Sequence, residues 1–413
     1  MSITVALYSH DSVGLGHARR NRALAYALAA DLPRLTGQRV RGLLIAGHPD
    51  ATADPLPQGW DWLVLPGFTS TRQGYMCRSL DVSTERLWHL RSATAAAALE
   101  AMSPDLFIVD RHAFGVDDEL LPALEALRAA GTRCVLGMRE VLDTPKVAAT
   151  EWARIGGAPA VAHYYDAVWV YGDRSVYDPV STGEIPAELA GRTHFTGYLS
   201  HGRPDDLLTE SSVRADRPYV LTMVGGGSDG GRIGLAAAQA ALPAGHRHII
   251  LTGPQMPAED HQRILDAVRT SGHAEQIQVT RSAPHVPQLV RDAAAVVSMG
   301  GYNSLAEIMA TTTPALIVPR SSRRQEQPRR AKALAAVGAV EAIGPDQLTP
   351  PTLSGWLTHA VSRRTTRDAV DLDGLMHIGS FAAQEIAAKT LGADPFTAPI
   401  PTLNETRPVP HVH

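Results

Sequence analysis

The chain has few cysteines and no long apolar run, and each absence excludes a class of protein. Its two cysteines, Cys77 and Cys134, cannot build a disulfide framework and do not have metal-ligand spacing, so a reducing compartment is expected. No apolar run approaches the ~18 residues of a membrane span, and the opening MSITVALYSH lacks the basic start of a signal peptide. We therefore expect a cytoplasmic protein without a transmembrane segment.

Basic residues are also not in excess. The chain has 38 Lys and Arg against 42 Asp and Glu, a formal net charge of -4. A nucleic-acid partner is disfavoured, because binding to phosphate backbones requires a broad basic surface. Five arginines do gather between residues 320 and 330, namely Arg320, Arg323, Arg324, Arg329 and Arg330. They suit a small anion, although solvation at the surface is the simpler expectation for Arg320 and Arg323.

Length and pattern predict two domains of the α/β class. A chain of 413 residues exceeds what one ordinary core holds. In each half, apolar runs of strand length alternate with stretches of helical periodicity, which indicates Rossmann-like parallel sheets covered by helices. The predicted boundaries are 1–200 for the first domain, 201–217 for a linker, 218–375 for the second domain, 376–395 for a closing helix and 396–413 for a flexible tail.

Each half begins with a strand, a glycine-rich turn and a helix, a junction that favours anions through exposed N–H groups and the helix dipole. The first turn, Gly14-Leu15-Gly16, has Arg19 where a dinucleotide-binding fingerprint needs its third glycine, which disfavours a simple dehydrogenase. In the second half, three strand ends carry Gly225–Ser228, Gly300–Gly301 and Glu326–Gln327. Because ligands bind beyond the carboxyl ends of parallel strands, we expect these groups to face one crevice.

The stretch SMGGYNSLAE, residues 298–307, allows two interpretations. Ser304 and Glu307 have the spacing of a capping box, in which the glycines only make the turn. Alternatively, this strand–glycine–helix junction holds a phosphorylated ligand, and Glu307 accepts hydrogen bonds from ribose hydroxyls. Three such junctions in one half of the chain favour the second interpretation.

The block GGYNSLAEIMATTTPALIVPRSSRRQEQPRRAKALAAVGAV closely resembles the nucleotide-sugar site of the GT-B glycosyltransferases, especially the family 28-type branch related to the peptidoglycan transferase MurG. VGGGSDGG is similar to the phosphate loop of that family, and GLGHARRNRALA to its amino-terminal glycine-rich loop. The resemblance spans nearly all of residues 3–345. It implies a GT-B fold, with two Rossmann-like domains facing across a cleft, and transfer of a sugar from a nucleoside diphosphate without a metal or other cofactor.

The resemblance also implies a role for each matching residue. The implied nucleotide-sugar-binding residues are Gly14, Gly16, Gly226, Gly227, Ser228, Val286, Gly300, Gly301, Asn303, Ser304, Glu307, Glu326 and Gln327. Among these, the glycine loop and Asn303-Ser304 approach the diphosphate, Glu307 holds the ribose, and the backbone near Val286 receives the base. Glu326 and Gln327 grip the sugar. The family often has Asn where this chain has Arg330, so contacts there are expected to differ.

The catalytic machinery is expected in the first half. His17 follows the glycine turn after a strand, and a histidine can take a proton from an acceptor hydroxyl near neutral pH. Asp110 ends another strand and could orient the imidazole, as the aspartate of a triad does, or merely cap the next helix. Several GT-B transferases pair a histidine with an aspartate at matching positions. No metal site is predicted, since Asp371-Leu372-Asp373 has suitable spacing but lies in a predicted loop far from the motifs.

Other activities share these motifs. GLGHARR is also similar to the loop of the UDP-sugar hydrolase of pseudaminic acid synthesis, in which the histidine activates water. A nucleotide-sugar 2-epimerase and a non-catalytic nucleotide-sugar-binding protein are further alternatives. For a transferase, we expect inversion, a UDP-sugar or a dTDP-sugar as donor, and a soluble small-molecule acceptor that contacts residues 68–91. The sequence does not predict the oligomeric state.

Overall fold

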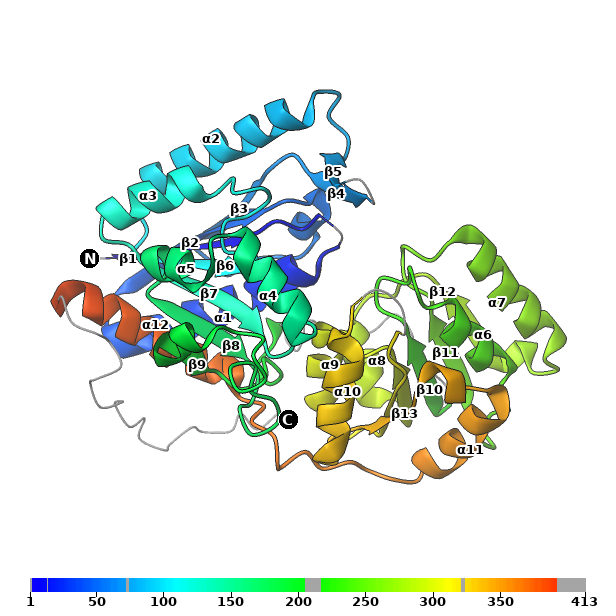
Figure 1. Cartoon of the computed structure of the whole chain (residues 1–413). Helices are drawn as coiled ribbons and strands as arrows, with labels where there is room; N and C mark the ends of the chain where they lie inside the picture. The colour runs from blue at the N-terminus through cyan, green and yellow to red at the C-terminus, as the bar shows by residue number, and fades with distance from the viewer. Residues whose placement is uncertain (1, 13, 72–73, 205–216, 321–323, 392–413) are drawn as a thin grey trace.

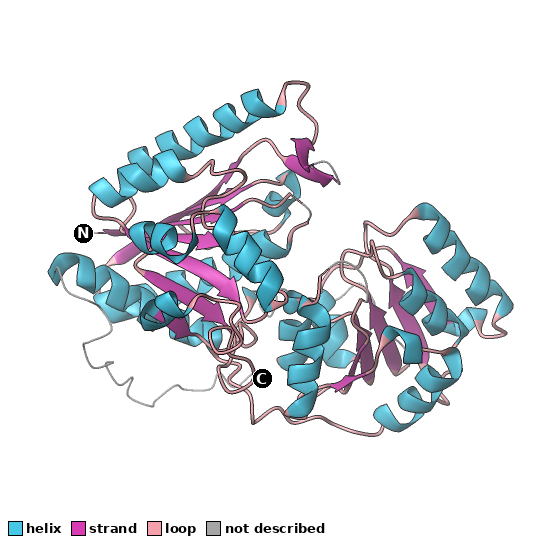
Figure 2. Ribbon diagram, in the orientation of Figure 1, coloured by secondary structure: helices cyan, strands magenta, loops and turns pink. Residues whose placement is uncertain are grey.

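Two parallel sheets, one in each half of the chain, organise the computed structural model, which describes residues 2–12, 14–71, 74–204, 217–320 and 324–391 (Figures 1 and 2). The first sheet has the strand order β3-β2-β1-β6-β7-β8-β9, and the second has the order β12-β11-β10-β13-β14-β15. Helices cover both faces of each sheet. The predicted α/β class with two Rossmann-like domains is confirmed.

The strands of both sheets coincide closely with the apolar runs of the sequence. The first sheet contains β1 (Ser2–Ser9), β2 (Arg39–Ala46), β3 (Trp60–Val64), β6 (Leu106–Asp110), β7 (Arg133–Arg139), β8 (Ala167–Tyr171) and β9 (Thr193–Phe195). The second contains β10 (Tyr219–Met223), β11 (Arg247–Leu251), β12 (Ile277–Thr280), β13 (Ala295–Ser298), β14 (Ala315–Ile317) and β15 (Glu341–Ala342). Strands β6, β8, β10 and β13 are buried at every position, as expected of parallel strands covered on both faces.

The helices lie between these strands. In the first half they are α1 (Gly16–Thr36), α2 (Thr84–Met102), α3 (Leu121–Ala129), α4 (Pro145–Arg154) and α5 (Gly157–Tyr164). In the second half they are α6 (Gly231–Gln239), α7 (Ala258–Thr270), α8 (Val286–Asp292), α9 (Tyr302–Met309), α10 (Glu326–Ala336), α11 (Pro350–Ala360) and α12 (Gly374–Leu391). Within the described part of the chain, no helix has the length and apolar character needed to cross a membrane.

A short hairpin was not predicted. Strands β4 (Phe68–Thr71) and β5 (Gly74–Cys77) pair antiparallel within the segment expected to contact the acceptor. Residues 72 and 73 lie outside the described residues. Polar and apolar residues mix in this segment without clear alternation, so its sequence carries little strand signal.

The closing helix returns to the first domain. Predicted over 376–395, it is observed as α12, which packs along α1 against one face of the first sheet (Figure 1). Arg133 Nη2 binds Glu385 Oε2 at 2.7 Å and fixes the helix to β7. Asp371 and Asp373 lie where the chain crosses back, since Tyr198 N donates to Asp371 O and Leu199 pairs with Asp373. Residues 205–216 of the predicted linker, and the predicted tail, lie outside the described residues.

The strand order of each sheet creates a crevice. Strand β1 lies between β2 and β6, and strand β10 lies between β11 and β13. The chain therefore leaves β1 and β10 toward one side of the sheet and later returns on the other side. Connections that diverge in this way open a crevice at the carboxyl ends of the strands, which is where open α/β sheets bind ligands.

Candidate active site

The crevices of the two sheets face each other and bring most of the predicted residues together. His17 follows β1 and Asp110 ends β6, whereas the glycines of the second half follow β10 and β13. Two hydrogen bonds join the crevices. Asn303 Nδ2 donates to Gly16 O at 2.8 Å, and Arg19 Nη2 donates to Glu307 Oε1 at 2.8 Å. Residues that are almost 300 positions apart in the sequence are thus direct neighbours.

Asp11 shapes the turn between β1 and the first turn of α1, which carries His17. Its backbone is left-handed, with φ 43°, and the residue is fully buried. The carboxylate accepts hydrogen bonds from Ser9 Oγ at 2.6 Å and from Ala18 N at 3.1 Å, so it caps the first turn of α1 from outside the helix. Arg78 Nη2 donates to Asp11 O at 2.7 Å and ties the hairpin segment to this loop. Asp11 was not among the residues predicted from the sequence, although an Asp before a glycine turn is a typical capping signal.

The His17 imidazole contacts the buried ion pair of Asp110 and Arg20. Its Nδ1 lies 3.3 Å from Asp110 Oδ2, and Arg20 Nη2 lies 2.6 Å from the same oxygen and 3.1 Å from Nδ1. Burial alone would raise the pKa of Asp110, but the charges of Arg20 and His17 outweigh burial and lower the pKa to about 2. Nδ1 faces this pair, so Nε2 is the ring nitrogen that points away from it. Arg20, which shares Asp110 with His17, was not among the residues predicted from the sequence.

Two further histidines line the same crevice. The ring of His10 lies 5.0 Å from that of His17 and 4.2 Å from that of His112, measured between centroids. His10 Nδ1 accepts from Ser12 N at 3.3 Å, so its proton sits on Nε2. Burial lowers the pKa of both His10 and His112, which keeps them neutral near pH 7. Among the residues that the structure describes, no group of three or more His, Cys, Asp or Glu side chains is arranged to hold a metal ion.

Two glycines of the second half, Gly227 and Gly300, occupy positions that only glycine fits. Gly227 has φ 94°, and a Cβ there would lie 2.1 Å from Thr252 O. Gly300 has φ 80°, and a Cβ there would lie 2.7 Å from Ile317 Cγ2. Gln255 N donates to Gly226 O at 2.8 Å and fixes the loop. The backbone at both strand ends is therefore bare, as close approach to a ligand requires.

The capping-box interpretation of SMGGYNSLAE is wrong. Helix α9 begins at Tyr302 with Gly301 as N-cap, and no side chain caps it, because Ser304 already lies inside the first turn. The Glu307 side chain, 1% exposed, instead accepts from Arg19 at 2.8 Å and from Arg203 Nη1 at 3.4 Å. Arg203 Nη2 also donates to Asn303 Oδ1 at 2.9 Å. A carboxylate is thus held one turn into α9, beside the bare glycines.

Glu326 and Gln327 lie at the start of α10, and Arg320 connects them to the glycine loop after β10. Arg320 Nη2 binds Glu326 Oε1 at 2.7 Å, its backbone N donates to Gln327 Oε1 at 3.1 Å, and its Nη1 lies 3.4 Å from Asp229 Oδ2. The expected solvation of Arg320 is wrong, since its side chain is 19% exposed. Arg323 lies outside the described residues. Two of the three predicted junctions of the second half, at Glu326–Gln327 and at the loop after β10, are therefore joined through Arg320.

The pKa of Glu326 reflects the arginines around it. Burial would raise this pKa, but the charges of Arg139, Arg330, Arg320 and Arg324 lower it to about 2. Arg139, at the end of β7, binds Glu326 Oε2 at 3.2 Å across the domain boundary. Glu326 is therefore a carboxylate at all but strongly acidic pH, able to accept hydrogen bonds from hydroxyl groups.

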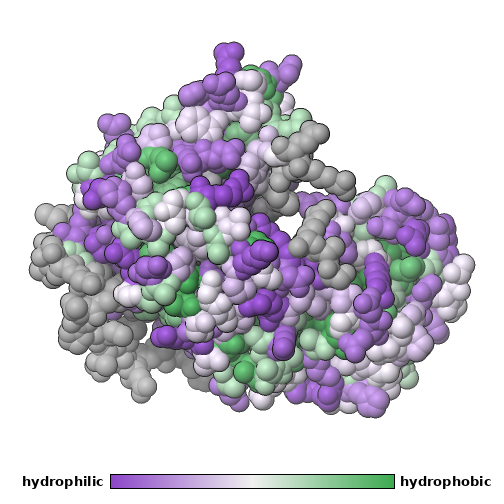
Figure 3. Space-filling view, viewed as in Figure 1, coloured by the Kyte–Doolittle hydropathy of each residue, from purple (hydrophilic) through white to green (hydrophobic). Residues whose placement is uncertain are grey.

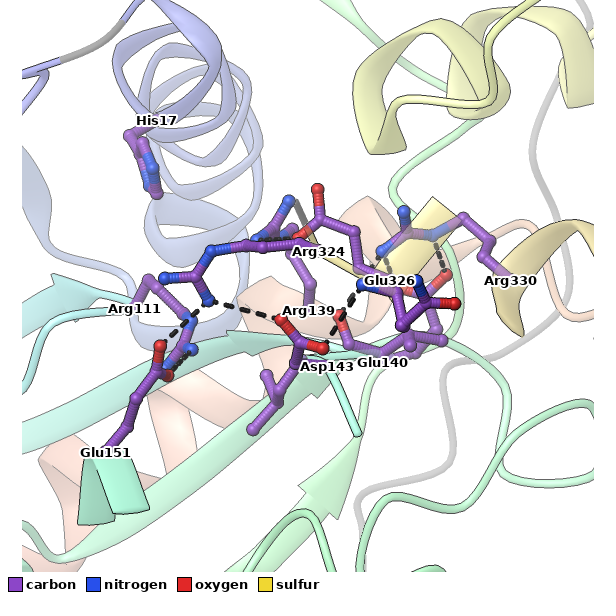
Figure 4. A network of polar contacts seen from close by, with 12 residues as sticks. His17, Arg111, Arg139, Glu140, Asp143, Glu151, Arg324, Glu326 and Arg330 are labelled. Carbon is purple, nitrogen blue, oxygen red and sulfur yellow. Dashed lines mark hydrogen bonds and ion pairs between the residues drawn. The ribbon is translucent and has the colours of Figure 1, made fainter. Parts of the chain in front are cut away.

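Arginines of the second domain reach acids of the first (Figure 4). Arg330 Nε binds Glu140 Oε1 at 2.6 Å with both side chains fully buried, and Arg330 Nη1 lies 3.5 Å from Gly300 O. Arg324 Nη1 binds Glu151 Oε1 at 2.8 Å. Hydrophilic residues accordingly gather where α4 faces α10 (Figure 3). The departure from the family's Asn at position 330 thus serves domain contact, and Glu140, its partner, was not identified from the sequence.

Val286 lies at the start of α8, whose N-cap His285 is left-handed with φ 53°, and α8 packs beside α9. Ser228 is exposed and donates to Asp229 Oδ1 at 3.1 Å. Gly14 and Gly16 lie opposite the second domain, where a Cβ would be 3.7 Å from Gln255 Nε2 and 3.5 Å from Asn303 Nδ2, respectively. All the residues predicted to bind the nucleotide sugar are within the described part of the chain.

Comparisons with known proteins agree with this arrangement. Residues 221–372 match the Glycosyltransferase family 28 C-terminal domain. Over 157 residues, the chain is 31% identical to the UDP-N-acetylglucosamine–N-acetylmuramyl-(pentapeptide) pyrophosphoryl-undecaprenol N-acetylglucosamine transferase of Brucella anthropi. That match covers 36% of this chain and 40% of the relative, so it spans less than half of the relative's length.

Solved structures share the fold over nearly the whole chain. The UDP-GlcNAc 2-epimerase of Neisseria meningitidis superposes with a TM-score of 0.57 at 13% identity, covering 95% of this chain and 100% of that one. MurG of Acinetobacter baumannii gives a TM-score of 0.51 at 14% identity, covering 95% and 99%. At such identities the likeness shows the fold alone. This chain therefore has the GT-B fold of these structures, and its residues 221–372 are similar to the glycosyltransferase family 28 C-terminal domain.

Proposed function

We propose that this protein is an inverting glycosyltransferase that moves a sugar from a nucleoside diphosphate, UDP or dTDP, to a soluble small-molecule acceptor. The observation that carries the proposal is the apposition of the two crevices. The first turn of α1, which carries His17, lies against α9, where Asn303 bonds Gly16 and Glu307 bonds Arg19. A base and a nucleotide-binding carboxylate therefore flank the same space.

The second domain supplies the donor site. The bare loops at Gly227 and Gly300 let backbone N–H groups approach a diphosphate, and the first turn of α9 adds the positive end of its dipole. Glu307 accepts hydrogen bonds from the ribose, the backbone at Val286 receives the base, and Glu326 with Gln327 binds hydroxyls of the sugar. The same N–H groups stabilise the charge that develops on the leaving diphosphate, and this electrostatic role requires no cation.

The first domain supplies the acceptor site and the base. With Nδ1 directed at Asp110, Nε2 of His17 takes the proton of an acceptor hydroxyl as the hydroxyl oxygen bonds to the anomeric carbon. The bond from that carbon to the diphosphate breaks on the opposite face, which inverts the configuration. The hairpin β4–β5 and the start of α2 border the acceptor side, because Arg78 anchors this segment to Asp11, in the turn that precedes α1 and His17.

Two other activities fit the fold. A 2-epimerase of the same fold superposes with a TM-score of 0.57, and in a hydrolase His17 would activate water. A 2-epimerase exchanges the proton at C2 of the sugar with solvent and needs no acceptor. A hydrolase releases free sugar without an acceptor, and a non-catalytic binding protein releases neither free sugar nor the nucleoside diphosphate.

The product mixture separates these activities. We expect UDP release from a UDP-sugar to depend on a hydroxyl-bearing acceptor, supplied as a panel of sugars and small aglycones, with the anomeric configuration of the product inverted by NMR. Acceptor-independent release of free sugar would replace the transferase by a hydrolase. Incorporation of deuterium at C2 of the sugar in D₂O would indicate an epimerase instead of a transferase. Retention of the anomeric configuration in the product would contradict the single displacement.

A further inference from the structure

Arg19 bridges the two domains at the proposed donor site. It lies in the first turn of α1, next to the glycine turn, and its Nη2 donates to Glu307 Oε1 at 2.8 Å. The Arg19 side chain is 39% exposed, whereas Glu307 is 1% exposed. A partner of this partly exposed side chain is therefore the carboxylate proposed to hold the ribose.

Glu307 does not depend on Arg19 for charge compensation. Arg203 Nη1 lies 3.4 Å from the same Oε1 atom, and its side chain is only 5% exposed. Arg203 is also fixed by Leu199 O, to which its Nε donates at 2.8 Å, and by Asn303 Oδ1 at 2.9 Å. If Arg19 leaves, the buried carboxylate keeps an anchored positive partner. Arg19 is thus the exchangeable one of the two arginines.

Binding of a nucleotide would favour this exchange, because the ribose hydroxyls compete for Glu307 and the diphosphate offers Arg19 a second anion. The Glu307 carboxylate has about four lone-pair sites, and Arg19 occupies one of them on Oε1, so its departure would free that site for a ribose hydroxyl. The diphosphate would lie at Asn303 and Ser304, about one helical turn, or ~5 Å, from Glu307. Arg19 can span that distance by rotating its side chain. Its bond to a carboxylate would then be replaced by one to a phosphate, which is also charge-assisted.

We propose that Arg19 is a donor-binding residue that exchanges Glu307 for the diphosphate when the nucleotide sugar binds. The inference rests on the proposed function, because it takes the site to be a nucleoside-diphosphate site. It assigns to Arg19 a role in recognising the phosphates, rather than the ribose or the base. It also explains why an arginine can stand where a dinucleotide-binding loop has its third glycine.

Calorimetric titration with UDP, together with NMR-observed binding of uridine, tests this role. We expect Arg19→Ala to weaken UDP binding about tenfold, as the loss of one charge-assisted bond of ~1.4 kcal/mol would do. Uridine binding should be unchanged or tighter, because Glu307 is freed. Arg19→Lys should recover part of the UDP affinity. Arg363→Ala is the matched control, since Arg363 Nη2 binds Glu341 Oε1 at 2.7 Å on the surface of the second domain.

The alternatives give different results. Tighter UDP binding to Arg19→Ala would show that Arg19 only competes for Glu307, and equal weakening of UDP and uridine would show a structural role. Either result overturns the exchange while the donor site stands. If wild-type protein binds none of UDP, dTDP and GDP, the proposed function fails and the exchange fails with it.

Discussion

Replacing His17 by alanine is expected to lower the rate of sugar transfer by ~10²–10⁴-fold, the range for loss of a general base. The acceptor hydroxyl then has no comparable base beside it. His10 and His112 line the same crevice, but burial lowers their pKa values and so makes them weaker bases. UDP affinity should change little, because His17 is proposed to act on the acceptor hydroxyl, whereas the second domain and Arg19 are proposed to bind the nucleotide. Initial rates of UDP release and calorimetric UDP affinity, measured on the same preparation, check both parts.

His359→Ala is the matched control. His359 is exposed on α11 and its Nδ1 contacts only the local Gly355 O at 2.7 Å, so transfer should proceed at the wild-type rate. Near-wild-type turnover by His17→Ala would remove His17 from the base role. A loss of UDP binding that parallels the loss of turnover would assign His17 to the donor site instead.

Arg330→Ala is expected to destabilise the fold by roughly 3–5 kcal/mol, the effect of removing one partner of a buried ion pair. Arg330 and Glu140 are both fully buried and join at 2.6 Å, one from each domain. Without Arg330, the Glu140 carboxylate is left in a low-dielectric environment with its charge uncompensated. Equilibrium urea unfolding of wild type and variant measures the loss.

A double variant and a surface control separate the charge effect from lost packing. Arg330→Met combined with Glu140→Leu removes both charges and should recover most of the stability, but not all, because the Tyr198 hydroxyl then loses its hydrogen bond to Glu140. Arg34→Ala, which breaks an exposed pair with Asp31, should cost less than about 0.5 kcal/mol. If Arg330→Ala were as stable as wild type, the Arg330–Glu140 pair would not hold the domains together.

The parts of the fold that the sequence predicts are those encoded locally. Strands such as β6 and β10 are uninterrupted apolar runs, and the glycines at 227 and 300 mark turns that no other residue fits. These signals lie within a few residues of the structure they specify. His17, Asp110 and Glu307 could be placed near the carboxyl ends of strands for the same reason.

The contacts between domains have no local signal. Arg19 and Glu307 are 288 residues apart, and Arg330 and Glu140 are 190 residues apart, yet each pair is in direct contact. Which arginine meets which acid depends on how the two sheets dock, and no periodicity records this. The same applies to α12, which was predicted as a helix but could not be assigned to the first domain.

The proposed nucleotide site is tested most directly by a thermal-shift panel of UDP, dTDP and GDP on wild type and Glu307→Gln. A nucleotide at a hundred times its dissociation constant adds about 2.7 kcal/mol to the stability of the protein that binds it. We expect that at least one nucleotide stabilises the wild type, that Glu307→Gln loses most of this response, and that the surface control Glu341→Gln keeps it. If no nucleotide stabilises the wild type, or if Glu307→Gln responds equally, the site between the two crevices is not a nucleoside-diphosphate site.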